Sequence, residues 1–437
     1  MSASSPTPRL ARLEFLGTPR FVNALTTAII GVAASTFGLE HLAGWPGIVG
    51  ILACLVVLAA ASAFVRRSTL DWQGILPISL IAFVGWCTIS VLWSEYQWAT
   101  LSSVLYQLAF ASLAVYIALT RDMIQIVRAF GNVLRALLGA SIFFEVVSGI
   151  IIDSPLPFFG MTGDLVSGGP IQGIAGDPAR LGILSLIAGI TFAVELLTRS
   201  VQRVTSIVSL AGAISLILLT HSNVVMAAGI AVIIAAVLLT GVRHTTPAVR
   251  LPIIWGIVAL GVVAVGVVAI FRSAVLDALS SSDQVSNRIG LWRQLTRFLA
   301  DNNGLEGWGW VGRWRLDLTI FSVFPQVQDS PYPSAFNAFF DVWFQVGLVG
   351  LGLFLGLVGL AVVRSWLLAV RQPSVVYLWP ALVLVALVST AFTESAIIVE
   401  FCWLSLVICV VKSANKLSWR TAFERIRSAP QPEFRER

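Results

Sequence analysis

Arginine side chains in one polar segment are the residues whose type and spacing best suit chemistry in this chain. The segment spans residues 272–336 and holds Arg272, Arg288, Arg293, Arg297, Arg313 and Arg315. A guanidinium group stays charged at physiological pH and binds phosphate through two parallel hydrogen bonds. The segment therefore indicates a phosphate-binding site, and contact with lipid headgroups is the alternative.

A helix is predicted in the middle of this segment. Apolar residues recur there with a period near 3.6, at Val285, Ile289, Trp292, Leu295 and Leu299. Arg288 flanks this apolar stripe beside Trp292, whereas Arg293 and Arg297 are i,i+4 neighbours on the other flank. The amphipathic pattern predicts that the helix lies on a membrane surface with its apolar face down.

Two stretches after this helix are also suited to binding. Residues 304–314 combine glycines, which let backbone approach a ligand, with tryptophans, which stack on sugar or lipid faces. An interfacial aromatic belt is the structural alternative. Asn337, Asp341 and Gln345 are spaced i, i+4, i+8 and form a polar stripe where a membrane helix begins. Such groups usually face a cavity or form hydrogen bonds between helices.

The elements that position these residues are predicted to be membrane-spanning helices. Charged residues make up 11% of the 437 residues, hydrophobic residues 57%, and the mean hydropathy is +0.89. A soluble domain carries about 25% charged residues, and a span needs about 20 apolar residues. Together these features predict an all-α integral membrane protein with about twelve spans. Their approximate positions are 21–39, 46–65, 74–94, 100–120, 129–152, 181–198, 204–221, 223–242, 251–271, 337–362, 375–392 and 396–412.

The distribution of charge predicts the topology. Lys and Arg concentrate in alternate connecting segments and in the C-terminal tail, as the positive-inside rule requires. The predicted organisation is a cytoplasmic segment 1–20, nine spans within 21–271, a large extracytoplasmic loop 272–336, three spans within 337–412 and a cytoplasmic tail 413–437. Both termini are thus expected in the cytoplasm, with the chain in the cytoplasmic membrane.

Several other classes of function are not expected. The net charge of +6 does not indicate nucleic-acid binding, because the basic residues lie in short segments between spans. His41, His221 and His244 are far apart in sequence and no Cys/His cluster is present, so neither a metal site nor a cofactor is predicted. The four cysteines lie in apolar runs, where no structural disulfide is expected.

The order of these motifs resembles the O-antigen ligase and polymerase family, whose members act on polyprenyl-diphosphate-linked glycans. The resemblance covers roughly residues 170–410. It rests on an Arg-x3-Trp helix (Arg288, Trp292), a Gly-x-Gly turn (Gly307, Gly309), Asn337 followed by Gly-Leu-Val-Gly-Leu, a late Thr-Glu-Ser (393–395) with Trp403, and the Gly-rich residues 173–182. It implies metal-independent glycan transfer at the outer face of the cytoplasmic membrane, in cell-surface polysaccharide biosynthesis.

Two of the family's catalytic groups are absent from this chain. Phe336 stands where the family has a His, and Asn223 stands where it has a phosphate-binding Arg. By the resemblance, Arg288 is the catalytic cation that stabilises the leaving diphosphate. His221, close to the missing Arg position, is the predicted substitute for the base. Asp341 and Glu394 are carboxylate alternatives for that role.

The remaining residues of the predicted site are expected to bind substrate. They are Arg180, Trp292, Arg293, Asn337 and Asp341. The expected partners are a polyprenyl-diphosphate-linked glycan donor, a glycan or lipid acceptor, and membrane lipids, with no nucleic acid and no cofactor.

Two alternative functions follow from the same residues. The missing His and Arg are compatible with a catalytically degenerate relative that binds or assembles components of polysaccharide export. A secondary transporter is the other alternative, and it needs a buried ionisable site. Arg135 and Glu145 share one span but lie about 15 Å apart along its axis, so they cannot pair directly. The sequence also has no internal repeat of the kind found in many transporters.

Overall fold

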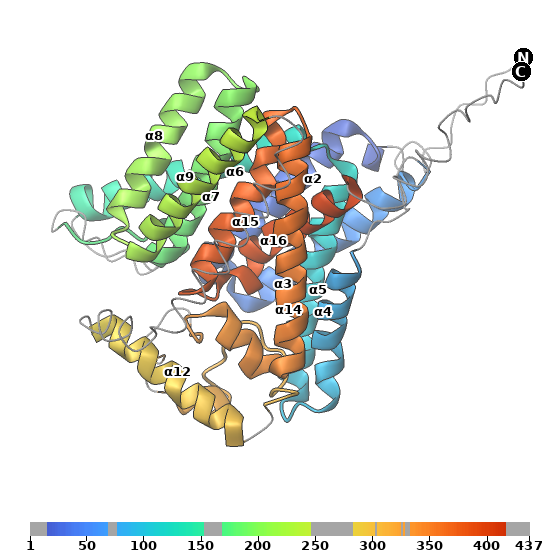
Figure 1. The fold of residues 1–437 in the computed structure, drawn as a ribbon, viewed down its shortest axis with the longest axis vertical. Helices are drawn as coiled ribbons and strands as arrows, with labels where there is room; N and C mark the ends of the chain where they lie inside the picture. Colours follow the sequence, from blue (N-terminus) through green and yellow to red (C-terminus); the bar gives the residue numbers. More distant parts are fainter. Residues whose placement is uncertain are drawn as a thin grey trace, which may run out of the picture.

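The protein is a helical bundle in the parts of the chain that the structure describes. The computed structural model describes residues 15–68, 77–152, 168–245, 283–301, 304–324, 327 and 333–416. Every regular element within these ranges is a helix. Most of these helices lie side by side, and α12 (Asp283–Asp301) lies across one end of the bundle (Figure 1).

Six described helices are long and apolar enough to cross a membrane. They are α3 (Thr36–Val65), α5 (Gln97–Thr120), α6 (Met123–Val146) with its continuation to Ile152, α7 (Pro178–Thr198), α9 (Asn223–His244) and α14 (Ala338–Arg371). Shorter apolar helices pack among them: α2 (Pro19–Ala34), α4 (Ile78–Ile89), α8 (Arg203–Leu219) and α15 (Leu378–Ala391). A last helix, α16 (Glu400–Lys416), packs against α5 and α14.

These helices confirm a polytopic helical architecture. Each expected span overlaps one of them except 251–271, which lies outside the described residues. The count of twelve spans, and the loop between the ninth and tenth, therefore stay predictions. One boundary differs from expectation: α3 begins at Thr36 and bends at Gly44 and Pro46, because Gly44 adopts a positive φ and Pro46 has no N–H to donate.

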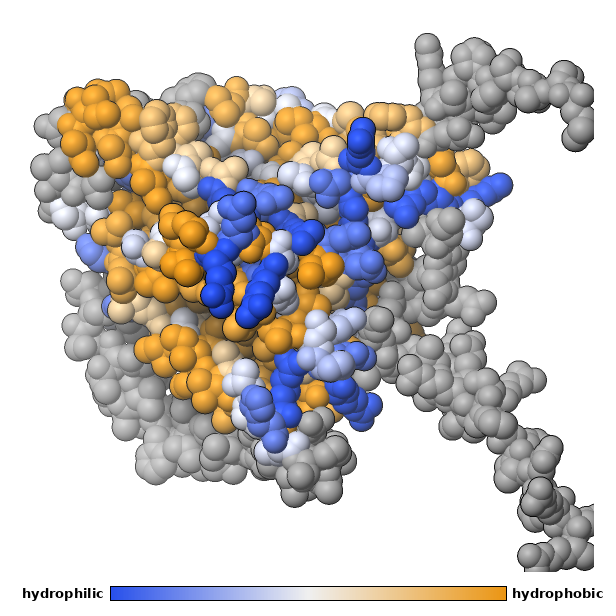
Figure 2. All heavy atoms as spheres, turned by 90° about the horizontal axis from the view of Figure 1, so that it is seen from above, coloured by the Kyte–Doolittle hydropathy of each residue, from blue (hydrophilic) through white to orange (hydrophobic). Residues whose placement is uncertain are grey.

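Basic residues hold the turns at the end of the bundle opposite α12. The Arg128 guanidinium donates to the Ser200 carbonyl at 2.8 Å, and that of Arg243 donates to the Gln372 carbonyl at 3.1 Å. Figure 2 looks onto this end, where hydrophilic side chains gather between apolar ones. The alternation of charge along the sequence thus matches two ends of one bundle. Which end faces the cytoplasm stays a prediction.

The helix in the polar segment is confirmed, but its apolar face does not match the predicted membrane contact. Leu291, Leu295 and Leu299 of α12 are buried in a cluster with Trp314 and Phe344. The apolar stripe therefore packs on the segment that follows α12 and on α14. The reason is that residues 304–324 supply their own large aromatic surface, which α12 covers.

A break in α14 joins this segment to the bundle. Val346 and Gly347 leave helical geometry, so carbonyls in the preceding turn are free to accept from outside the helix. Trp308 and Gly309 donate their backbone N–H groups to the Phe344 and Gln345 carbonyls at 3.3 and 2.8 Å. The Gly-x-Gly turn thus brings its backbone against α14, and its approach to a ligand stays a prediction.

A Gly347→Ala variant is expected to lose about 2 kcal/mol or more of stability. Gly347 has a φ of +69°, and a Cβ there would collide with the backbone of Leu305 and Glu306. Thermal unfolding of the purified protein measures the loss. Gly352→Ala is the matched control, because a Cβ at Gly352 on the same helix meets nothing within 4 Å. Equal midpoints for the two variants would contradict this account of the break.

Candidate functional site

Arg288 lies at the junction between α12 and the turn that links α15 to α16. Its guanidinium donates to the Thr393 carbonyl at 2.7 Å and to the Glu394 carboxylate at 2.9 Å. A guanidinium has five N–H donors, and these two bonds are the ones that Arg288 makes within the described residues. The side chain stays 24% exposed. Arg288 therefore keeps donors that a phosphate group can take up.

Phe336 occupies the family's His position and contacts Arg288. Its ring centroid lies 5.0 Å from the guanidinium carbon, a cation–π distance. Phe336 also has a φ of +48°, which is uncommon for an aromatic residue. The strained position thus presents a side chain to Arg288, although that side chain cannot accept a proton.

Burial raises the pKa of Glu394 to about 7, against the lowering effect of the Arg288 charge. The negative charge of Asp177 raises this pKa further, and the positive charge of Arg180 lowers it. Glu394 thus titrates near neutral pH beside a phosphate-binding cation. It also links the environment of Arg288 electrostatically to the start of α7.

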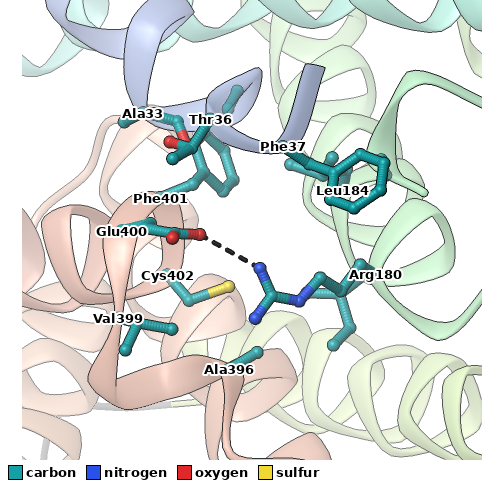
Figure 3. Close-up of a pocket in the computed structure, with 13 residues that line it drawn as sticks. Ala33, Thr36, Phe37, Arg180, Leu184, Ala396, Val399, Glu400, Phe401 and Cys402 are labelled. Atoms are coloured by element: carbon teal, nitrogen blue, oxygen red, sulfur yellow. Dashed lines mark hydrogen bonds and ion pairs between the residues drawn. The ribbon is translucent and has the colours of Figure 1, made fainter. Parts of the chain in front are cut away.

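A second ionic cluster is centred on Glu400, the first residue of α16. Its carboxylate accepts from Arg180 at 3.0 Å and from Arg313 at 2.5 Å (Figure 3 shows the Arg180 contact). Arg313 also donates to Glu40 at 2.9 Å, and the Tyr106 hydroxyl donates to Glu400 at 3.4 Å. The cluster therefore joins α3, α5, α7, α16 and the segment after α12.

The sequence pattern explains the orientation of Arg180. Asp177 caps α7 by accepting from the Arg180 N–H at 2.9 Å, and Pro178 occupies the first turn, where no N–H is needed. Gly176 before it has a positive φ of +69°. The Gly-Asp-Pro turn thus starts the helix at a fixed residue, so that Arg180 reaches across to Glu400 (Figure 3).

The polar stripe on α14 binds the segment that precedes it. Asp341 is fully buried and accepts from the Trp314 indole at 2.5 Å and from the Ala335 N–H at 3.2 Å. The Gln345 side-chain amide oxygen accepts from the backbone N–H groups of Val311 and Gly312 at 2.8 and 2.7 Å. The stripe therefore forms hydrogen bonds with the non-helical segment before α14, a partner that neither interpretation of its spacing named.

The other predicted substrate-binding residues lie close to Arg288, with one exception. Asn337 caps α14 and donates to the Phe392 carbonyl at 2.9 Å. Trp292 stacks on Phe340 and donates to the Ala335 carbonyl at 2.8 Å. Arg293 is exposed on the opposite flank of α12. Direct contact of these residues with a substrate stays a prediction.

His221 makes no hydrogen bond or ion pair with Arg288 or Glu394 within the described residues. It is exposed in the turn between α8 and α9, has a φ of +48°, and donates its backbone N–H to the Leu218 carbonyl at 3.2 Å. Its imidazole has no hydrogen bond within the described residues. The structure brings Glu394, not His221, against Arg288, and catalysis by His221 is a prediction without a geometric partner.

Four residues of the ionic cluster were not identified from the sequence as site residues: Glu40, Tyr106, Arg313 and Glu400. Their signal was weak, because Glu40, Tyr106 and Glu400 are single polar residues within or at the end of apolar runs, and Arg313 is one of six arginines in a long loop. One local feature does mark Glu400, which has a φ of +50°. Strained backbone at a non-glycine residue is enriched at functional sites, but it is visible only in the fold.

The buried ionisable residues that a transporter would need have protein partners. Arg135 pairs with Glu195 of α7 and donates to Ser209 at 3.0 Å. Glu145 accepts from the backbone N–H groups of Gln172 and Gly173, both at 2.7 Å. Arg135 and Glu145 therefore have separate partners, as their spacing on one helix requires.

Comparison with known protein families gives a match to part of the chain. The family model described as O-antigen ligase matches residues 208–355, which include α8, α9, α12 and the start of α14. No curated protein matches the chain. The matched residues contain Arg288, Trp292, Gly307, Gly309 and Asn337, whereas residues 173–182, residues 393–395 and Trp403, which also carry the resemblance, lie outside the match. The match supports the resemblance of this chain to the O-antigen ligase family, and its long apolar helices support a membrane protein.

Proposed function

We propose that this protein transfers a glycan from a polyprenyl diphosphate to an acceptor hydroxyl, at the outer face of the cytoplasmic membrane. The observation that carries the proposal is the pairing of Arg288 with Glu394. A cation with free donors and a carboxylate that titrates near neutrality lie 2.9 Å apart. Glycosyl transfer needs a cation to stabilise the diphosphate that leaves and a base to take the proton of the hydroxyl that attacks.

Arg288 binds the diphosphate of the donor in this mechanism. As the bond between the anomeric carbon and the diphosphate oxygen breaks, its electron pair stays on that oxygen. The guanidinium donates to the developing charge, and such stabilisation is strongest where charge appears in the transition state. Arg180, whose charge acts on Glu394, lies close enough to contribute to the same field.

Glu394 is the general base in this mechanism. The acceptor oxygen forms the new bond to the anomeric carbon, and its proton passes to the Glu394 carboxylate. When Arg288 turns to the diphosphate, Glu394 loses a favourable partner and its proton affinity rises. Donor binding thus makes the deprotonated carboxylate a stronger base, while a smaller fraction of it stays deprotonated at pH 7. Among the three base candidates, Asp341 is fully buried with protein partners, and His221 makes no hydrogen bond or ion pair with Arg288 within the described residues.

A second candidate function is favoured by Phe336. Its ring covers Arg288 at the position where the family has its base, which suits a binding or assembly component without catalysis. In that case neither Arg288 nor Glu394 variants alter glycan length or attachment, whereas binding of the lipid-linked glycan persists.

A Phe336→His variant separates the two functions. Histidine tolerates a positive φ better than phenylalanine does, so the fold is expected to persist. An imidazole beside Arg288 stays neutral at pH 7, because the nearby cation lowers its proton affinity. Transfer is expected to rise about tenfold at most, since Glu394 already acts as a base. The assay is glycan attachment in cells, compared with a Phe340→His control. Unchanged attachment would favour the non-catalytic function.

A further inference from the structure

A cavity beside the Glu400 cluster is distinct from the Arg288–Glu394 pair. Its volume is about 350 Å³, at the lower end of the range of about 300–1,000 Å³ for small-molecule sites. Aromatic side chains dominate its wall: Trp45, Tyr106, Phe110, Trp310, Trp314 and Trp403. Nothing in the proposed chemistry at Arg288 uses this space.

The aromatic wall is held rigid. The Trp403 indole donates to the backbone carbonyl of Gln107 at 3.3 Å, and the Trp314 indole donates to the Asp341 carboxylate. Trp45 and Tyr106 pack with ring centroids 5.2 Å apart. Flat π-faces bind the C–H faces of sugar rings, and rigid side chains lose little entropy when a ligand binds.

Gln107 supplies a polar group that the protein does not satisfy. The residue lines the cavity and is 4% exposed, its amide has no nitrogen or oxygen partner at hydrogen-bond distance within the described residues, and the only polar group that acts on it there is the weakly bonding Cys87 thiol. A buried amide without partners is costly. A primary amide offers one donor group and one acceptor, which matches neighbouring hydroxyls of a sugar. A lipid tail would leave it unsatisfied.

The charges on the cavity wall are paired within the protein, and Arg315, which also lines the cavity, pairs with Asp317. Arg313 bridges Glu40 and Glu400, and Tyr106 donates to Glu400. An uncharged ligand therefore suits the cavity better than an anion does. Arg313 and Gly312 also line a small cavity of about 20 Å³ with Arg180 and Ser395, the residue after Glu394. The large cavity thus lies next to the reacting groups.

We propose that this cavity is a subsite for an uncharged sugar unit of the glycan, recognised by aromatic stacking and by the Gln107 amide. The proposal rests on the proposed function for the source of the sugar. It goes further by placing a specificity-determining contact on α5, away from the phosphate-binding arginine.

Sugar binding by the purified full-length chain in phosphatidylcholine nanodiscs tests the proposal. The probes are the methyl glycosides of glucose, galactose, mannose and N-acetylglucosamine, detected by saturation-transfer NMR. At least one is expected to bind. Gln107→Leu is expected to weaken that binding about five- to tenfold, the contribution of one neutral hydrogen bond. Ser103→Phe, which adds a ring at the cavity wall, is expected to abolish it.

The stability of the variants separates a ligand contact from a structural one. Gln107→Leu removes a buried amide with no nitrogen or oxygen partner within the described residues, so its thermal midpoint is expected to equal or exceed that of the wild type. Gln97→Leu is the matched control, because Gln97 is exposed on the same helix, and its sugar binding is expected to be unchanged. A lowered midpoint for Gln107→Leu would indicate a structural amide and overturn the proposal.

The outcomes distinguish this subsite from the proposed function. Sugar binding that depends on Gln107, in a chain that transfers no glycan, would support the subsite and refute the transfer. Glycan transfer by a chain that binds none of the probes would support the transfer and refute the subsite. Binding that is equal in wild type, Gln107→Leu and Ser103→Phe would also overturn the subsite, as would phospholipid recovered from the wild type but not from Ser103→Phe.

Discussion

An Arg288→Ala variant is expected to lose glycan transfer by about 10²–10³-fold, the usual effect of removing one donor that stabilises a developing anion. The guanidinium is the family-matched cation, and it lies at the edge of α12 with free donors. The variant is expected to reach the membrane in normal amounts, because Arg288 is partly exposed and its loss opens no apolar cavity.

Accumulation of lipid-linked glycan in cells measures this effect, with surface-attached glycan scored in parallel. Arg297→Ala is the matched control, since Arg297 is exposed on the same helix. Arg288→Lys is expected to be intermediate, because it keeps the charge but loses the planar fork. Normal attachment by Arg288→Ala at wild-type protein levels would refute the transfer mechanism.

A Glu394→Gln variant is expected to lose about 10²–10⁴-fold in rate, the range for removal of a general base. Gln keeps the shape of the side chain and an oxygen that accepts from Arg288, so the local contacts persist. Glu95→Gln is the control, because Glu95 is exposed in the turn before α5. A rate within twofold of wild type, about 0.4 kcal/mol, would exclude Glu394 as the base.

The pH dependence follows from the raised pKa of Glu394. The base acts in its deprotonated form, so the wild-type rate is expected to rise with pH through about 7 and then level off. Glu394→Gln is expected to lack this rise. A pH–rate profile of purified protein with lipid-linked glycan checks both, and a wild-type profile that is flat between pH 5 and 8 would contradict the assignment.

The raised pKa of Glu394 also determines how its contribution to protein stability changes with pH. The folded-state pKa is raised above the ordinary value of the carboxyl, so the folded state binds more protons than the unfolded chain does between the two values. The contribution of Glu394 to stability therefore falls as pH rises toward 7. Glu394→Gln is thus expected to be at least as stable as the wild type at pH 8, so that its rate loss is not a folding defect.

The cations at this site are paired with carboxylates, and this affects how a substrate can bind. Within the described residues Arg180, Arg288 and Arg313 each contact a carboxylate. A diphosphate must therefore share or displace these carboxylates. The ion pairs keep the site close to neutral when the donor is absent. Their exchange for contacts with the diphosphate couples donor binding to the release of Glu394.

The amino-acid sequence by itself determined the helices and the position of Arg288 on one of them. Membrane spans follow from composition over about 20 residues, and the period of α12 follows from the apolar residues along that helix. These are local properties, as is the family resemblance carried by Arg288 and Trp292. The placement of basic residues at one end of the bundle is also a property of the order of segments along the chain.

Only the tertiary structure decided which groups meet. Glu394 lies 106 residues from Arg288 in sequence, and Glu400 lies 220 residues from Arg180. No periodicity relates such pairs, because their separation depends on how the helices pack and where α14 breaks. The cavity around Gln107 has the same origin, since its walls come from α3, α5, α16 and the segment after α12. Packing also turned the apolar face of α12 onto the protein, where a local amphipathic pattern could not distinguish protein from lipid.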